Sequence, residues 1–195
     1  MSHNIRTFDA DNFRRICRQL SKQDLDLKNI ILQHGYSPMW TRPATFQTLI
    51  LTILEQQVSL AAAYAAFKKL KERIGYVTPA KILLLSDEEM RACYFTRQKM
   101  GYARGLAEAI QSKKIQLKKL TALPDEEVRR ELIQLKGIGH WTVDVYLMHA
   151  LQRTDLFPLG DIALVNSLKE VKQLPKDISK EEMLAIAESW RPYRT

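Results

Sequence analysis

The chain has 195 residues, 46% of them hydrophobic, which is enough to bury a full core in one domain or in two small helical lobes. Its 30 Lys and Arg exceed its 22 Asp and Glu and give a formal net charge of +8. This charge is about equally compatible with a polyanionic partner, most commonly nucleic acid, and with a merely basic soluble protein. Only two cysteines are present and they form no CxxC pair, so a four-cysteine zinc site or iron–sulfur cluster is excluded.

The N-terminal residues lack the apolar core of a signal peptide, and no apolar run reaches the length that spans a bilayer. Cys17 and Cys93 are expected to be free thiols in a reducing compartment. These features predict a soluble, cytoplasmic protein, which would be associated with the nucleoid if the cell is bacterial.

Apolar residues at helical spacing occupy most of the chain, beginning with the stretch from Gln47 to Leu70. The polar segment Gln56-Gln57-Val58-Ser59 interrupts this stretch, and the helix can divide into two there. Capping signals then predict a short helix from Thr78-Pro79, another from Ser86, and a longer one from Thr96 to about Gln111.

Further helices are predicted in the second half of the chain. Leu123-Pro124 opens one that runs to Leu135, and another follows Trp141 as far as Leu151. Asp161 begins a helix to about Val171, and Ser179 opens a last one, with a capping box, through Trp190. The loops of any length are Tyr36–Thr45 and Lys172–Asp177, and no strand is convincing. We predict an all-α fold of roughly nine to eleven helices.

Gly137 and Gly139 flank Ile138 between two of these helices. Glycines permit positive φ, and such a turn directs backbone N–H groups outward at the positive end of the next helix, where they can bind a phosphate. Ile138 would fill the space between the two helices. Glycine also ends many helices for purely structural reasons. The close spacing of the glycines and the positive net charge favour phosphate binding.

Asp161 follows the turn-forming segment Phe157-Pro158-Leu159-Gly160 and precedes an apolar helical run, so it is predicted to cap that helix. Most aspartates at such positions have no other role. The helix N-terminus would keep the carboxylate negative at neutral pH, as a catalytic anion requires. Of the other acids nearby, Asp144 is expected to be structural and Asp155 to be a solvated loop residue.

The run Leu135-Lys136-Gly137-Ile138-Gly139-His140-Trp141-Thr142-Val143-Asp144, together with Asp161 twenty residues beyond Trp141, resembles the helix-hairpin-helix and catalytic aspartate of the base-excision DNA glycosylase superfamily. Within it, Trp141 and Glu55-Gln56-Gln57-Val58-Ser59 are most similar to the alkylbase branch, 3-methyladenine DNA glycosylase II. The resemblance extends from about Pro43 to the C-terminus.

This resemblance implies a two-lobed helical fold in which residues 1–195 form a single domain, made of two subdomains with a cleft between them, with the hairpin over about residues 127–151. It implies a monomer that binds double-stranded DNA containing damaged bases. The main-chain carbonyls of Leu135 and Gly137 would be among the ligands of a structural monovalent cation, and no other cofactor is expected. The DNA-contacting residues would be Lys136, Gly137, Ile138, Gly139, His140 and Thr142.

The resemblance also assigns the chemistry. Loss of a base leaves an oxocarbenium-like sugar, which the Asp161 carboxylate would stabilise while it orients or deprotonates the attacking water. Trp141 stands where the strand-cutting branches carry a lysine that forms a Schiff base, and tryptophan cannot be that nucleophile. The enzyme would therefore be monofunctional, with Trp141 as an aromatic wall for a flipped, alkylated purine. Ordinary helix packing is the alternative for this tryptophan.

The polar segment after the first long helix has two interpretations. Two adjacent amides can cap or bridge backbone groups, which is about as compatible with the sequence as a role in substrate binding. The resemblance would instead place Gln56 against the flipped base and Gln57 as the wedge that fills the gap in the duplex.

Relatives normally continue for one more helix that supplies a second pocket aromatic, for which Tyr146, Tyr36 and Trp40 are candidate replacements. Larger bacterial members also carry an N-terminal β-domain that this sequence does not show.

The leading interpretation is a monofunctional DNA glycosylase that removes alkylated purines by base flipping. One alternative is a glycosylase for another damaged or mismatched base. Another is a catalytically inactive helix-hairpin-helix module that binds DNA and senses damage. A basic helical scaffold that never meets DNA is a weaker third.

Overall fold

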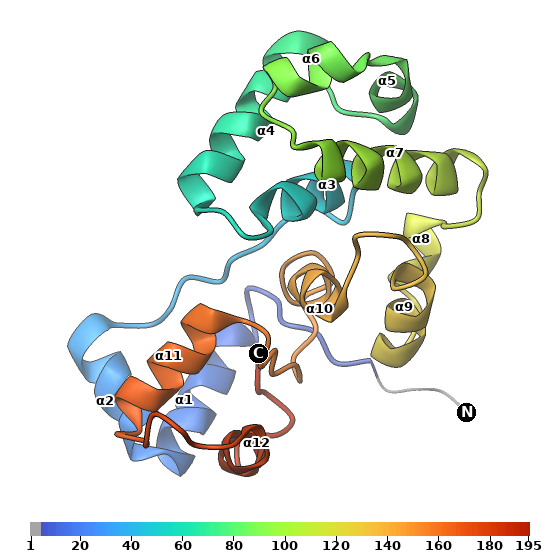
Figure 1. Ribbon diagram of the computed structural model, residues 1–195. Coiled ribbons are helices and arrows are strands. Elements are labelled where there is room, and N and C mark those ends of the chain that lie inside the picture. The colour runs from blue at the N-terminus through green and yellow to red at the C-terminus, as the bar shows by residue number, and fades with distance from the viewer. Residues whose placement is uncertain (1–4) are drawn as a thin grey trace. The chain divides into compact units, whose positions relative to one another are not determined.

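The computed structural model describes residues 5–195, which form twelve α-helices and, in place of strands, a single isolated antiparallel bridge between Thr7 and Arg153 (Figure 1). The all-α prediction is confirmed. Across this described range, no helix combines the length and the apolar character that crossing a membrane requires. The helices are α1 (Phe13–Gln23), α2 (Leu25–His34), α3 (Phe46–Glu55), α4 (Leu60–Ile74), α5 (Pro79–Leu84), α6 (Asp87–Ala92), α7 (Arg97–Gln111), α8 (Leu117–Leu120), α9 (Asp125–Leu132), α10 (His140–His149), α11 (Ile162–Val171) and α12 (Lys180–Glu188).

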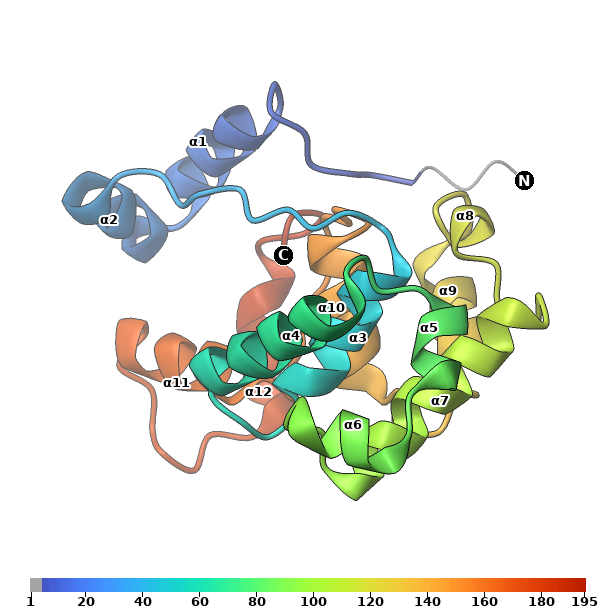
Figure 2. The same cartoon turned by 90° about the horizontal axis from the view of Figure 1, so that it is seen from above.

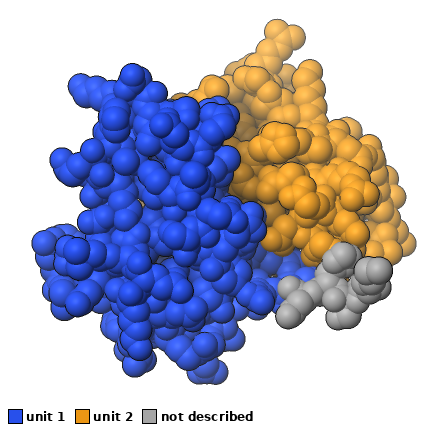
Figure 3. All heavy atoms as spheres, turned by 90° about the horizontal axis from the view of Figure 1, so that it is seen from below, with its two compact units in different colours: residues 1–41, 151–195 blue, residues 42–150 orange. Residues whose placement is uncertain are grey.

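The chain divides into two compact units (Figure 3). The central unit is Arg42–Ala150 and contains α3 to α10. The terminal unit combines the residues up to Thr41 with Leu151–Thr195 and contains α1, α2, α11 and α12. The helices of the predicted hairpin, α9 and α10, therefore belong to the central unit, and Asp161 belongs to the terminal unit.

Helix α3 is the most buried element of the central unit, where it packs against α4, α7 and α10 (Figures 1 and 2). Every residue of α3 except Gln47 is buried, as expected for a helix with apolar residues on all sides. The helix ends at Glu55 and α4 begins at Leu60, so the polar segment does divide the predicted stretch in two. Ser59 caps α4 by accepting a hydrogen bond from the N–H of Ala62 (3.2 Å).

Capping side chains begin four further helices where the sequence predicted them. The side chains that accept a hydrogen bond from the backbone N–H three residues later are those of Thr78, Ser86, Thr96 and Ser179. The last of these also forms the predicted capping box, since the Glu182 carboxylate accepts from the N–H of Ser179 (2.9 Å). Caps of this kind each stabilise a helix by about 1 kcal/mol.

Three predicted helix ends are wrong by two or three residues. Helix α9 ends at Leu132 rather than Leu135, α10 at His149 rather than Leu151, and α12 at Glu188 rather than Trp190. Beyond the ends of α9 and α12 the chain bonds back by only three residues, from the N–H of Leu135 to Leu132 (3.1 Å) and from that of Trp190 to Ala187 (3.1 Å). The last turn therefore tightens to a 3₁₀-type turn, which apolar periodicity does not reveal. No bounds were predicted from the sequence for α1, α2 and the single-turn α8.

The terminal unit has its own apolar core, formed by Leu168, Met183, Ala187 and Trp190. Asp24 ties α2 to this core. One of its oxygens caps α2 through the N–H groups of Asp26 (2.9 Å) and Leu27 (3.2 Å), and the other accepts from Lys172 Nζ (2.6 Å) and the Trp190 indole (2.8 Å). Burial raises the pKa of Asp24, but these hydrogen bonds lower the pKa by more, so that it lies below its ordinary value. A charged Asp24 thus joins α2, α11 and the segment after α12.

Candidate functional site

The glycine turn between α9 and α10 depends on one residue in the left-handed region. Gly137 has φ +88°, and a Cβ at this position would overlap the ring of Tyr102 on α7. Glycine is therefore required there. Gly139 has φ −95°, and a Cβ on it would meet nothing within 4 Å. The positive φ expected of the glycine pair is confirmed at Gly137 and absent at Gly139.

The first turn of α10 offers backbone N–H groups to an anion. The N-cap of α10 is Gly139, and no side chain caps the helix. Lys136 and His140, which precede and follow the glycines, are exposed. The positive end of α10 therefore has the chemistry predicted for phosphate binding, with two nitrogen-bearing side chains beside it in the sequence.

Three further residues of the hairpin are engaged inside the protein. Ile138 is buried, in agreement with its expected place between the helices. Thr142 is only 2% exposed, and its hydroxyl accepts a hydrogen bond from Nε2 of Gln56 (2.9 Å). A DNA contact of the Thr142 side chain is not supported, because the hydroxyl is committed within the central unit. Asp144 has the structural role expected of it, since it pairs with Arg129 of α9 (2.7 Å).

Gln56 lies directly after α3 and is bonded to the hairpin. Its Nε2 donates to the carbonyl oxygen of Gly137 (2.7 Å) and to Oγ1 of Thr142 (2.9 Å). This is the bridging role that the sequence allowed for an amide in this segment, and contact with a flipped base stays a prediction. Gln57 is exposed and has φ +56°, a left-handed conformation that costs a non-glycine residue about 1–2 kcal/mol. An exposed side chain at this position is compatible with the predicted wedge.

The two carbonyls predicted to bind a cation each accept one hydrogen bond within the central unit. Leu135 accepts from the N–H of Ile138 (3.0 Å) and Gly137 accepts from Gln56 (2.7 Å). A carbonyl oxygen has two lone pairs, so the chemistry of both groups still fits a monovalent cation. Cation binding at the hairpin stays a prediction.

Asp161 caps α11, as predicted. Its Oδ1 accepts hydrogen bonds from the N–H groups of Ala163 (3.0 Å) and Leu164 (3.1 Å), and its own N–H donates to the carbonyl of Pro158 (2.8 Å). These bonds hold the half-buried carboxylate at the start of α11. A carboxylate held in this way can stabilise a positive charge without first being reoriented.

The candidate pocket aromatics differ in exposure. Trp141, in the first turn of α10, is half-buried, whereas Tyr36 and Trp40 are exposed. The guanidinium of Arg14 lies 5.9 Å from the ring centroid of Tyr36, within the range of a cation–π contact. Tyr146 is fully buried, and burial raises the pKa of its hydroxyl to about 12. The structure therefore does not favour Tyr146 as a stacking partner, because neither face of its ring is accessible.

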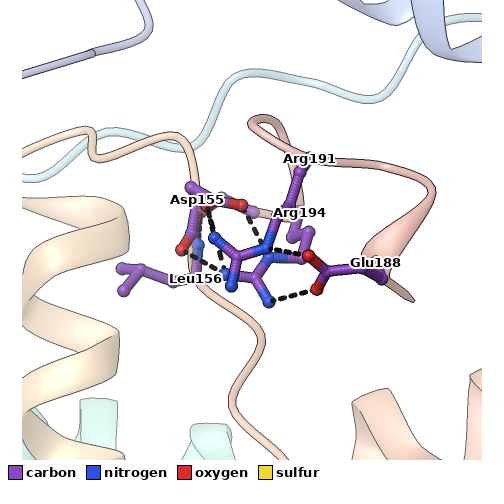
Figure 4. A network of polar contacts seen from close by, with 6 residues as sticks. Asp155, Leu156, Glu188, Arg191 and Arg194 are labelled. Atoms are coloured by element: carbon purple, nitrogen blue, oxygen red, sulfur yellow. Dashed lines mark hydrogen bonds and ion pairs between the residues drawn. The ribbon is translucent and has the colours of Figure 1, made fainter. Parts of the chain in front are cut away.

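Asp155 was expected to be a solvated loop residue, and this prediction is wrong. Its side chain is 25% exposed and pairs with Arg191 (2.9 Å) and Arg194 (2.6 Å), while Glu188 pairs with Arg191 (2.8 Å) (Figure 4). These ion pairs fasten the C-terminal residues to the segment that precedes Asp161. Asp155 is thus part of a structural network.

The two cysteines are free thiols, as predicted, and burial raises the pKa of both.

Sequence reasoning missed a buried ion pair at the end of α3. The side chain of Glu55 is 3% exposed, and its oxygens accept from the two terminal nitrogens of Arg42, Nη1 to Oε2 at 2.8 Å and Nη2 to Oε1 at 2.7 Å. This contact raises the pKa of Arg42. The available signal was a lone acid at the end of an apolar helix, because a buried carboxylate needs a cationic partner.

Known proteins resemble this chain in sequence and in fold. Residues 50–192 match the family described as HhH-GPD superfamily base excision DNA repair protein. DNA-3-methyladenine glycosylase 1 of Schizosaccharomyces pombe is 30% identical over 97% of this chain and 89% of its own length. The solved structure of 3-methyladenine DNA glycosylase (Mag1) from the same organism, in complex with abasic DNA, has a TM-score of 0.84 and 31% identity over 92% of this chain and 91% of that one. DNA-3-methyladenine glycosidase of Bacillus halodurans has a TM-score of 0.78 and 26% identity over 99% of this chain and 88% of that one.

Proposed function

The chain belongs to the HhH-GPD superfamily of base excision DNA repair proteins, and from this premise we propose that it is a DNA glycosylase that removes alkylated purines, of the 3-methyladenine kind, from double-stranded DNA. One observation carries the proposal. The S. pombe structure that the fold resembles is a 3-methyladenine DNA glycosylase bound to abasic DNA, which is the product that base removal leaves. The Bacillus halodurans relative, named for the same damaged base, supports this substrate class.

The proposed reaction is hydrolysis of the bond between C1′ of the deoxyribose and the base nitrogen. The base leaves with the bonding electrons, water adds to C1′, and the proton that the water loses passes to the carboxylate of Asp161. As the bond breaks, the sugar acquires oxocarbenium character, which the negative carboxylate stabilises. A purine that is positively charged by alkylation leaves as a neutral base, so no acid is needed to protonate it. The step as proposed uses water and Asp161.

The hairpin would supply the grip on the DNA backbone. Backbone N–H groups at the uncapped start of α10, with Lys136 and His140, would bind a phosphate. Gln57, on its left-handed turn, would fill the gap that a flipped base leaves, and Trp141 would stack on that base. Because tryptophan cannot form a Schiff base with the sugar, the enzyme would leave an abasic site in an uncut strand.

Incubation with methylated duplex DNA tests this proposal. We expect the protein to release alkylated purines, identified by chromatography and mass, and to leave abasic sites. Asp161→Asn should slow release at least about 100-fold and keep DNA binding, because asparagine can still cap α11. Asp177→Asn changes an exposed aspartate of the same unit and is the control. A protein that binds DNA and releases no base would overturn the proposal in favour of a damage-sensing module.

A further inference from the structure

We propose that Gln56 is a positioning residue that couples the exposed turn at Gln57 to the hairpin, so that both elements hold their DNA-binding geometry before DNA arrives. The inference rests on the proposed function, because it concerns how the chain grips damaged DNA. It replaces the predicted contact between Gln56 and the flipped base by contacts within the protein.

The amide nitrogen of Gln56 joins two parts of the hairpin. Its acceptors are the carbonyl of Gly137 (2.7 Å), the left-handed residue of the turn, and the hydroxyl of Thr142 (2.9 Å), in the first turn of α10. Each acceptor takes one of the two amide hydrogens, so the nitrogen is fully satisfied. Gln56 therefore connects the end of α3 to the turn and to the helix that follows it.

The residues before Gln56 are anchored as well. The carbonyl of Leu54 accepts a hydrogen bond from Nζ of Lys99 on α7 (2.7 Å). Glu55 is held by the guanidinium of Arg42 through contacts of 2.7 and 2.8 Å. Three consecutive residues are thus tied to three different parts of the central unit. The end of α3 cannot shift without breaking contacts to α7, to Arg42 or to the hairpin.

These anchors support an exposed turn in an unfavourable conformation. Gln57 has φ +56°, which residues with a side chain usually avoid. Val58 is 45% exposed and Leu60 is 62% exposed, so burial of the turn itself does not hold it in place. Such a conformation persists where the surrounding structure over-determines it. The anchored end of α3 is therefore a rigid base from which Gln57 and Val58 project.

Helix α7 holds the hairpin turn from a second side. The ring of Tyr102 occupies the place that a Cβ of Gly137 would take, and the Tyr102 hydroxyl is hydrogen-bonded to Gln98. Gly137 is thus fixed through its carbonyl by Gln56 and at its Cα by Tyr102. A turn held in this way loses little conformational freedom when its N–H groups bind a phosphate.

A rigid connection between the exposed turn and the hairpin matters most when the DNA has a gap to fill. A wedge side chain that is already in position loses less conformational entropy when it enters the gap in the duplex. Loss of the Gln56 amide should therefore weaken binding to a duplex with a missing base more than binding to an intact duplex. Because Gln57 would also fill the gap while a base is flipped, base release by saturating enzyme should slow by no more than the abasic affinity falls.

The test compares the affinity for a duplex that contains a stable abasic analogue with the affinity for the same duplex without damage, by fluorescence anisotropy. Gln56→Leu removes the amide, and Gln56→Glu keeps its shape but cannot donate a hydrogen bond when ionised. Gln116→Glu is the matched control, because Gln116 is an exposed residue of the central unit outside the hairpin and the change adds the same charge. Single-turnover release of 3-methyladenine is measured with saturating enzyme for each variant.

We expect both Gln56 variants to bind the abasic duplex about ten-fold more weakly than the wild type and Gln116→Glu, a loss typical of two hydrogen bonds. Binding to the intact duplex should weaken less, and single-turnover release should slow by no more than about the same factor as the abasic affinity. An abasic duplex has no base to contact. An unchanged abasic affinity with a slower single turnover would therefore show that Gln56 acts on the base, and it would overturn the inference. So would an equal loss on both duplexes.

Thr142 tests the same bridge from its other end, and it decides the question if the Gln56 variants do not fold. Thr142→Val removes the acceptor and Thr142→Ser keeps it. The inference expects weaker abasic binding for the first and wild-type binding for the second, and equal affinities would contradict it. If the wild type binds duplexes but releases no base, the proposed glycosylase activity fails, while the affinity comparison still decides the role of Gln56.

Discussion

Gly137 shows how one residue can serve two elements. Its φ of +88° forms the turn, and the absence of a Cβ leaves the space that the ring of Tyr102 fills. The Gly-x-Gly spacing predicted the first role. It could not predict the second, because Tyr102 lies on α7, outside the hairpin.

A pair of alanine substitutions separates these glycines. Gly137→Ala should lower the free energy of unfolding by about 1–3 kcal/mol, because it combines a strained φ with displacement of the Tyr102 ring. Gly139→Ala, at φ −95° and with open space at its Cβ, should cost under about 1 kcal/mol. Urea unfolding followed by circular dichroism measures both. Equal stabilities would mean that the turn does not need a glycine.

The cap formed by Asp161 could be predicted from the sequence, whereas the hydrogen-bond partners of Gln56 could not. The cap of Asp161 follows from local sequence, because an aspartate before an apolar helical run accepts hydrogen bonds two and three residues later. The partners of Gln56 lie 81 and 86 residues further along the chain. No local pattern contains information about contacts across such a separation, so the sequence left the bridge and the base contact as equal alternatives.

Among the helices, capped starts were predicted more reliably than ends, although the ends of α7 at Gln111 and of α11 at Val171 were predicted as well. A helix start is encoded within three residues by a capping side chain, as at Thr78, Ser86, Thr96 and Ser179. A helix end depends on where tertiary contacts turn the chain, and for α9 and α12 this happens before the apolar pattern runs out. The division between α3 and α4 was predicted because a polar segment interrupts a long apolar run there.

The link between α2, α11 and the segment after α12 gives a prediction for pH dependence. Burial raises the pKa of Asp24, but hydrogen bonds from Lys172 and Trp190 lower the pKa by more and hold it below its ordinary value. The folded protein therefore keeps this carboxylate charged at a pH where the unfolded chain, with a pKa of about 3.9, already binds a proton. The resulting stabilisation is fully present above the unfolded pKa and is lost as the pH falls through the folded pKa.

Asp24→Asn should consequently unfold more easily than the wild type at pH 7, by about 1–3 kcal/mol. The difference should shrink as the pH is lowered from about 5 to 2. Urea unfolding at several pH values gives both quantities. A difference that stays constant over this range would show that the charge of Asp24 does not stabilise the fold.

For the whole molecule, the net charge of +8 was about equally compatible with a polyanionic partner and with a merely basic soluble protein, and it could not say where a partner binds. Helical periodicity predicted helices and not their partners. The terminal unit combines helices from the two ends of the chain, α1 and α2 with α11 and α12, and nothing in the local sequence indicates this pairing. The hairpin could be recognised because all its parts are close together in the sequence.

The dependence of DNA affinity on salt tests the proposed phosphate contact at the hairpin. The logarithm of the association constant should fall linearly with the logarithm of salt concentration, with a slope of about −0.9 for each phosphate contact. Lys136→Gln should make this slope shallower by about one contact. Lys180→Gln, at the exposed start of α12, removes the same charge and should leave the slope unchanged. If the two variants have equal slopes, Lys136 does not contact a phosphate.

The central claim is that the Asp161 carboxylate stabilises the sugar as the base departs, and single-turnover release of 3-methyladenine from methylated duplex DNA tests it most directly. With saturating enzyme, Asp161→Asn should release the base at least about 100-fold more slowly than the wild type. Its affinity for an abasic duplex should match that of the wild type, because asparagine preserves the cap of α11. Release at the wild-type rate would contradict the account, since the negative charge would then be dispensable.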